Sequence, residues 1–146
     1  VGRLVSEVIE GLKLAHGHEP EVRLIVEAQS RVRASRDRLA QAFENVLSNA
    51  RSFAAAGTVV DARISRDQSH CRIEIADRGP GIPPEHIDRV FERFFTYRPD
   101  ADAESGRHTG LGLSIARTIV ESYGGTIEGG NRPNGPGAQF EIKLPL

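Results

Sequence analysis

The chain has 146 residues, of which 38% are hydrophobic and 27% are charged, and its formal net charge is −1. This length predicts one domain that can bury a core without disulfide or metal support. The near-neutral charge argues against a broad nucleic-acid surface, and no long apolar run predicts a membrane span. The single cysteine, Cys71, has no partner within the chain, which favours a reducing compartment.

The spacing of apolar residues predicts helices interleaved with strands. The expected helices cover residues 1–15, 39–54, 85–91 and 111–123. The expected strands cover residues 22–28, 31–34, 58–65, 70–76, 126–128 and 139–144; the first two are joined by a turn near Gln29 and Ser30. Ser35 or Asp37 can cap the helix at 39–54, and Gly57 is expected to end it. This order of elements predicts an α/β sandwich, with helices on one face of a mixed sheet.

The helix expected over residues 39–54 has a polar seam beside its apolar face. Asn45 and Asn49 are four residues apart in this seam and are therefore neighbours on the helix surface. Asparagine is a poor interior helix former, because its side chain competes for backbone hydrogen bonds. The pair indicates either a solvated polar edge or two neutral oxygen ligands and hydrogen-bond donors that face a cleft.

A glycine-rich loop follows the strand expected at residues 70–76. An ionised Asp77 accepts hydrogen bonds only, which suits an exocyclic amine such as that of adenine. Gly79 and Gly81 let the backbone approach a flat ligand closely, and Ile82 offers apolar contact to a ring. An ordinary turn at the end of a strand is the competing explanation, since Asp and Gly are common there.

A second glycine-rich stretch leads directly into the helix expected at residues 111–123. Gly110 and Gly112 place free N–H groups and the positive end of the helix dipole where phosphate can bind. The P-loop and Rossmann fingerprints are both absent, and an ordinary helix entry explains the same pattern. Residues 98–108, just before it, have almost no apolar content and predict a mobile loop.

Together these segments resemble the catalytic ATP-binding domain of sensor histidine kinases, within the wider group that includes gyrase, Hsp90 and MutL. The matching motifs are the N box at 43–53, the first glycine box at 77–83, the F box at 91–95, the second glycine box at 109–113 and the last glycine box at 135–140. Their order and spacing carry the resemblance, and the F box separates kinases from gyrase and MutL relatives. The resemblance implies one domain over residues 1–146 with the Bergerat fold. That fold is a two-layer sandwich, whose mostly antiparallel mixed sheet has about three helices on one face. It also implies a flexible ATP lid at residues 96–109.

The resemblance further implies ATP and Mg²⁺ as ligands and assigns roles to individual residues. Asn49 matches the Mg²⁺ ligand, and a neutral amide suits a metal that takes much of its ligation from water and phosphate. Asn45 matches the position that hydrolytic relatives fill with a glutamate base, so hydrolysis should be weak and ATP kept for transfer. Asp77 matches the adenine-recognising aspartate, and Gly110 and Gly112 match phosphate-contacting glycines. The other positions assigned to nucleotide binding are Ser52, Phe53, Gly79, Gly81, Ile82, Arg98, Arg107, His108, Thr109, Leu111, Leu113 and Gln139.

Four positions depart from the family pattern. Ser52 stands where a basic residue is common, Arg107 and His108 replace glycines, and Gln139 replaces a threonine. These departures bear on the triphosphate clamp, for which Arg98, Arg107 and His108 are the candidate charges.

The sequence contains no helical His-Glu/Asp-x-x-x-Pro box with a dimerisation hairpin, and His18 lies in the break at residues 17–20. The resemblance therefore implies the ATP-binding half of a kinase. Such a domain donates the γ-phosphate to a histidine on a separate dimerisation and phosphoacceptor domain, and a response regulator is its indirect partner. We expect no nucleic-acid partner, no direct membrane insertion and a cytoplasmic location, even for a membrane-anchored parent protein. An anti-sigma-type serine kinase and a non-catalytic ATP-gated interaction module are the alternatives.

Overall fold

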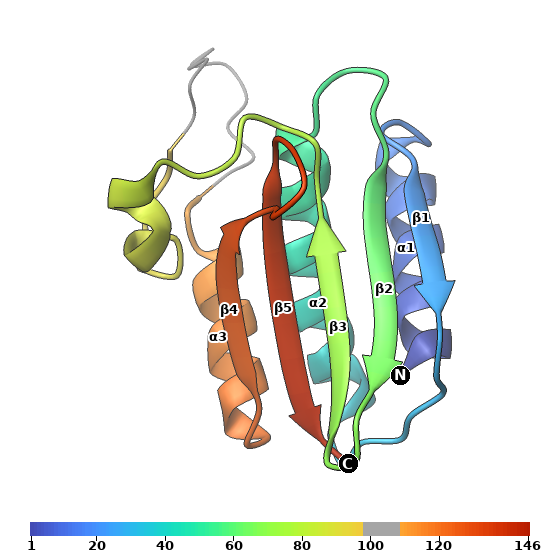
Figure 1. The fold of residues 1–146 in the computed structure, drawn as a ribbon. Helices are drawn as coiled ribbons and strands as arrows, with labels where there is room; N and C mark the ends of the chain where they lie inside the picture. The colour runs from blue at the N-terminus through green and yellow to red at the C-terminus, as the bar shows by residue number, and fades with distance from the viewer. Residues whose placement is uncertain (98–108) are drawn as a thin grey trace.

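In the computed structural model, which describes residues 1–97 and 109–146, three α-helices cover one face of a five-stranded sheet (Figure 1). The helices are α1 (Gly2–His16), α2 (Arg36–Phe53) and α3 (Gly112–Ser122). The strands are β1 (Val22–Val26), β2 (Val60–Arg66), β3 (His70–Ala76), β4 (Thr126–Asn131) and β5 (Ala138–Pro145). A 3₁₀ helix, η1 (Pro84–Arg89), lies beside the sheet. The predicted two-layer α/β sandwich is confirmed.

The sheet has the strand order β1-β2-β3-β5-β4. β1 runs parallel to β2, and the other neighbours pair antiparallel, so the prediction of a mixed, mostly antiparallel sheet is confirmed. Within the described residues no helix has the length and apolar content needed to cross a bilayer.

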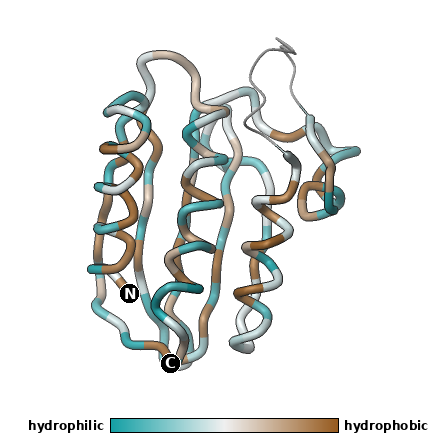
Figure 2. Tube along the Cα trace, turned by 180° about the vertical axis from the view of Figure 1, so that it is seen from behind, coloured by the Kyte–Doolittle hydropathy of each residue, from teal (hydrophilic) through white to brown (hydrophobic). Residues whose placement is uncertain are grey.

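The core lies between the sheet and the three helices. In β3 and β5 every second residue is buried, including Ile73 and Phe140, while the alternate residues are half-buried on the open face. α2 contributes Phe43, Val46 and Leu47, all fully buried, from one side of the helix. Figure 2 shows apolar residues recurring along the helices, as this packing requires.

The prediction of a strand at residues 31–34 is wrong, because these residues form no strand. β1 pairs with β2 in parallel, from Val22 opposite Val60 onwards, and does not form a hairpin with the residues that follow it. Val32 and Ala34 are half-buried against the core while Arg31 is exposed, so burial alternates there without a strand partner. The end of α2 also differs from the prediction, because Ala54 caps the helix and Gly57 lies in the next turn. Ser35 caps its start as predicted, accepting a hydrogen bond from the backbone N–H of Arg38.

Arg51 is a buried arginine that joins α2 to the end of α1. Only 8% of the surface of Arg51 is exposed to solvent. The guanidinium donates hydrogen bonds to the carbonyl oxygens of Leu12, Gly17 and Glu19 at 3.2, 2.7 and 3.2 Å. These oxygens lie at the C-terminal end of α1 and just beyond it, where the helix dipole favours a cation.

We expect Arg51→Ala to lower the free energy of unfolding by about 2–4 kcal/mol, because three buried or partly buried hydrogen bonds between α2 and the end of α1 are lost. Urea unfolding followed by circular dichroism measures this change. Arg33 is exposed and provides the control, since Arg33→Ala should change the free energy by less than about 0.5 kcal/mol. Equal losses in the two variants would contradict a structural role for Arg51.

Candidate functional site

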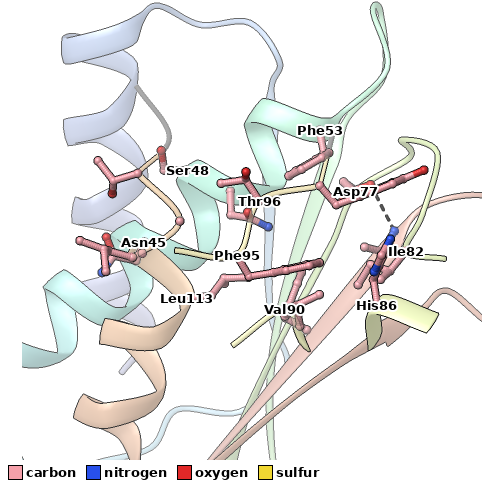
Figure 3. Close-up of a pocket in the computed structure, with 18 of the residues that line it drawn as sticks. Asn45, Ser48, Phe53, Asp77, Ile82, His86, Val90, Phe95, Thr96 and Leu113 are labelled. Atoms are coloured by element: carbon pink, nitrogen blue, oxygen red, sulfur yellow. Dashed lines mark hydrogen bonds between the residues drawn. The ribbon is translucent and has the colours of Figure 1, made fainter. Parts of the chain in front are cut away.

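A pocket of about 320 Å³ opens between α2, the loop after β3, η1 and the start of α3. Figure 3 shows Asn45 and Ser48 on one side of it and Asp77, Ile82 and His86 on the other. The predicted site residues that line the pocket are Asn45, Asn49, Phe53, Asp77, Gly81, Ile82, Thr109, Gly110, Leu111, Gly112 and Leu113. The structure therefore brings together three segments that are far apart in the sequence.

The two asparagines of α2 form one wall of the pocket. The apolar side of α2 is fixed against the sheet, which turns Asn45 and Asn49 toward the start of α3, and both are half-buried. A Cβ atom at Gly112 would lie 3.7 Å from Oδ1 of Asn45, so the backbone of α3 begins directly against this side chain. Nδ2 of Asn45 is buried and has no hydrogen-bond partner among the described residues. The polar seam is a pocket wall and not a solvated edge.

Asp77 lies at the opposite side of the pocket, directly after β3, and is 1% exposed. Its Oδ1 accepts hydrogen bonds from the backbone N–H of Gly79 at 2.8 Å and of Ala138 at 3.2 Å. Its Oδ2 is buried and has no partner within the described part of the chain. Burial raises the pKa of the Asp77 carboxyl, and the two backbone hydrogen bonds oppose part of that shift. The site therefore has one fixed acceptor oxygen and one vacant acceptor.

Gly79 positions this carboxylate by a close backbone contact. A Cβ atom at Gly79 would overlap the carbonyl oxygen of Phe53 at the end of α2. The loop therefore packs against the end of α2 at a point where only glycine fits.

We expect Gly79→Ala to lower the free energy of unfolding by about 1–3 kcal/mol and to displace Asp77, because the backbone must move apart. Gly130 in β4 is the matched control, since a Cβ atom there meets no described heavy atom within 4 Å. Thermal unfolding of the two alanine variants tests the contact. A Gly79→Ala protein as stable as Gly130→Ala would contradict it.

The rest of the pocket wall, most of it apolar or aromatic, consists of residues that the motifs do not individually predict as nucleotide contacts. These further lining residues are Ser48, His86, Val90, Phe95, Thr96, Tyr97, Ile115, Ala138 and Phe140; Phe95 belongs to the predicted F box, and Thr96 and Tyr97 to the start of the predicted lid. The ring of His86 lies 5.3 Å from that of Phe95 and 4.7 Å from that of Tyr97, measured between centroids. Nδ1 of His86 is buried without a partner among the described atoms. A lone histidine in a short predicted helix gave no signal of this position.

Some predicted residues do not line the pocket. Gln139, which is predicted to bind nucleotide, does not line the pocket. Its Nε2 donates to Oε1 of Glu74 at 3.2 Å on the open face of the sheet, while its neighbours in β5 face the pocket. Ser52 donates a hydrogen bond to the carbonyl oxygen of Asn49 at 2.9 Å, and neither it nor Gly79 is a lining residue. The predicted Arg98, Arg107 and His108, with most of the predicted lid, lie outside the described residues.

The arrangement has a distinct chemistry at each end. At Asp77 an apolar slot ends in a buried carboxylate oxygen, which suits a flat ring with an exocyclic amine. At α2 two amide side chains face the N-terminus of α3, whose free N–H groups suit an anion. The pocket therefore fits a ligand with a flat base at one end and an anionic group at the other.

Comparison with known proteins agrees with this chemistry. Residues 34–146 match the family model described as histidine kinase-, DNA gyrase B-, and HSP90-like ATPase. The sensor protein ChvG of Rhizobium meliloti is 36% identical over 98% of this chain and 27% of its own length. The sensor-like histidine kinase SenX3 of Mycobacterium tuberculosis is 36% identical over 99% of this chain and 35% of its own length. The chain thus spans about a quarter to a third of these relatives.

Solved structures give the same result. The mycobacterial sensor histidine kinase MprB superposes with a TM-score of 0.82 at 31% identity, covering 98% of this chain and 93% of that one. Full-length ShkA in complex with AMPPNP gives a TM-score of 0.79 at 29% identity, covering 98% of this chain and 29% of that one. The chain belongs to the histidine kinase-, DNA gyrase B- and HSP90-like ATPase family, as a catalytic ATP-binding domain of the sensor histidine kinase type.

Proposed function

We propose that the domain binds ATP with Mg²⁺ and donates the γ-phosphate to a histidine on a separate dimerisation and phosphoacceptor domain. The observation that carries the proposal is the vacant Oδ2 of Asp77, buried at the end of an apolar slot opposite two amide side chains. A buried acceptor without a partner is costly, so the site is built for a ligand that supplies a donor.

The Asp77 end supports recognition of adenine. The 6-amino group of adenine is a donor for Oδ2, and Ile82 and Val90 supply apolar contact to the ring. The 6-oxo group of guanine would instead face Oδ2 acceptor to acceptor. We propose that Asp77 selects ATP over GTP in this way.

The α2 end supports binding of the phosphates and the metal. Asn49 offers an amide oxygen for Mg²⁺, which supplies charge neutralisation to the phosphates when bound. Gly110 and Gly112 place backbone N–H groups at the start of α3 against the same space. Asn45 orients groups by hydrogen bonding but cannot take a proton from water, which favours transfer over hydrolysis. The chemistry then depends on positioning and electrostatics.

The size of the relatives supports a partner domain. ChvG and SenX3 extend well beyond the region that matches this chain, and the ShkA structure with an ATP analogue contains a region like this one within a longer protein. We propose that the acceptor histidine lies in such a separate domain, that a response regulator receives the phosphoryl group from it, and that the domain acts in the cytoplasm. ATP as donor and the free, buried Cys71 fit a cytoplasmic location.

Transfer to purified acceptors tests the proposal. The domain is incubated with Mg²⁺ and γ-labelled ATP, together with the histidine-bearing dimerisation domain of its own parent protein or the same domain with that histidine changed to alanine. We expect label that is stable in alkali and labile in acid, and only on the unchanged acceptor. If a serine-bearing regulatory protein is supplied as the acceptor, acid-stable label on it would instead indicate a serine kinase of the anti-sigma type. ATP binding without any transfer would indicate a non-catalytic module.

A further inference from the structure

We propose that Asn131 is a positioning residue for nucleotide binding, because it fixes the loop of residues 77–82 (loop 77–82) in the shape that receives the base. This inference rests on the proposed ATP-binding function and adds a residue from the far end of the chain to it. Asn131 is the last residue of β4 and does not line the pocket. Its effect is therefore exerted through the loop.

Both polar atoms of the Asn131 side chain bind the backbone of one pocket residue. Oδ1 of Asn131 accepts a hydrogen bond from the N–H of Ile82 at 2.7 Å, and Nδ2 donates to the carbonyl oxygen of Ile82 at 2.8 Å. The side chain thus pairs with Ile82 as the edge of a neighbouring strand would. Gly81 has a φ of 78°, and a Cβ atom there would lie only 2.7 Å from Oδ1 of Asn131. Glycine at position 81 is what lets the amide approach this closely.

The other end of loop 77–82 is held by the residue directly opposite Asn131 in the hairpin. Asn131 pairs with Ala138 in the β4–β5 register. The backbone N–H of Asp77 donates to the carbonyl oxygen of Ala138 at 3.0 Å, and the N–H of Ala138 donates to Oδ1 of Asp77 at 3.2 Å. One cross-strand pair at the tip of the hairpin therefore holds both the first and the last residue of the loop.

Because of this arrangement, loss of the Asn131 hydrogen bonds should affect nucleotide binding without unfolding the domain. Asn131 is exposed, and its two hydrogen bonds lie at the surface and outside the hydrophobic core. Removing them leaves the core contacts of β4 and β5 in place but frees the Ile82 end of the loop. A ligand that needs Asp77 and Ile82 in one fixed arrangement must then order the loop as it binds, which lowers its apparent affinity.

Asn131→Asp is the sharpest test, because aspartate keeps the size of the side chain and the Oδ1 acceptor but loses the Nδ2 donor. Calorimetric titration of the chain with ATP, ADP and adenosine should give dissociation constants raised by a common factor of about three to ten, the usual effect of one hydrogen bond. The common factor is expected because adenosine already contains the base that the loop receives. Asn131→Ala loses both contacts but places no second acceptor against the carbonyl oxygen of Ile82, and it should also raise the dissociation constants of all three ligands by a common factor.

Asn134→Asp is the matched control. Asn134 is exposed in the same hairpin, and the substitution makes the same change of charge, so the dissociation constants should stay at the wild-type values. A merely structural role for Asn131 would lower the fraction of protein that binds while leaving the dissociation constant unchanged, and that result would overturn the proposal. Wild-type affinity in Asn131→Asp, or an equal loss in Asn134→Asp, would also overturn it. Failure of the wild-type chain to bind ATP at all would instead count against the proposed function.

Discussion

Asp77→Asn is expected to weaken ATP binding by about tenfold or more while leaving the domain folded. Asparagine has nearly the same shape and keeps an oxygen that can accept from Gly79 and Ala138. It places an NH₂ group where the vacant Oδ2 stands, so a donor would face the exocyclic amine of adenine. A buried polar group without a partner costs roughly 1–3 kcal/mol, which corresponds to about tenfold or more in affinity.

Calorimetric titration with ATP and with GTP measures this effect and its specificity. The wild-type domain should prefer ATP, and Asp77→Asn should lose much of that preference. Asp88→Asn is the control, since Asp88 is exposed on η1 beside the pocket and its substitution removes the same charge. If the wild-type domain binds GTP as tightly as ATP, the assignment of Asp77 to adenine is wrong.

Asn49→Ala should have the largest effect on phosphoryl transfer. Loss of the amide oxygen removes the proposed Mg²⁺ ligand, and misplacement of the phosphates by even a small distance can lower the transfer rate about a hundredfold. Affinity for ATP with Mg²⁺ should fall much more than affinity for metal-free ADP. The core of the domain should not change, because Asn49 is only half-buried on the polar side of α2.

Two measurements separate this role from a general loss of structure. Titrations with Mg²⁺-ATP and with metal-free ADP give the ratio of the two losses, and single-turnover transfer gives the rate. Gln41→Ala is the control on an exposed position of the same helix. Equal losses for both ligands would remove Asn49 from the metal site.

Local patterns in the sequence were sufficient to predict α2 and the strand that ends just before Asp77. The 3.6-residue period of the apolar side of α2 determines which side faces the sheet, and this in turn determines where Asn45 and Asn49 point. The alternation in β3 likewise determines that Asp77 follows a buried strand.

Features that depend on distant parts of the chain were not predictable from these patterns. Local alternation does not reveal the parallel pairing of β1 with β2, so the alternation at residues 31–34 predicts a strand that does not form. Gln139 was assigned from a family motif, but its side-chain direction is set by the register of β5 with β3. His86 and Asn131 each depend on contacts with segments that only the folded chain brings close. Short motifs therefore identify the pocket but not every residue that shapes it.

The most direct test of the account is a crystal structure of the domain with Mg²⁺ and a non-hydrolysable ATP analogue. We predict that Oδ2 of Asp77 accepts a hydrogen bond from the 6-amino group of adenine and that Oδ1 of Asn49 ligates the metal beside the phosphates. A nucleotide bound with its base away from Asp77, or a metal without Asn49 among its ligands, would contradict it.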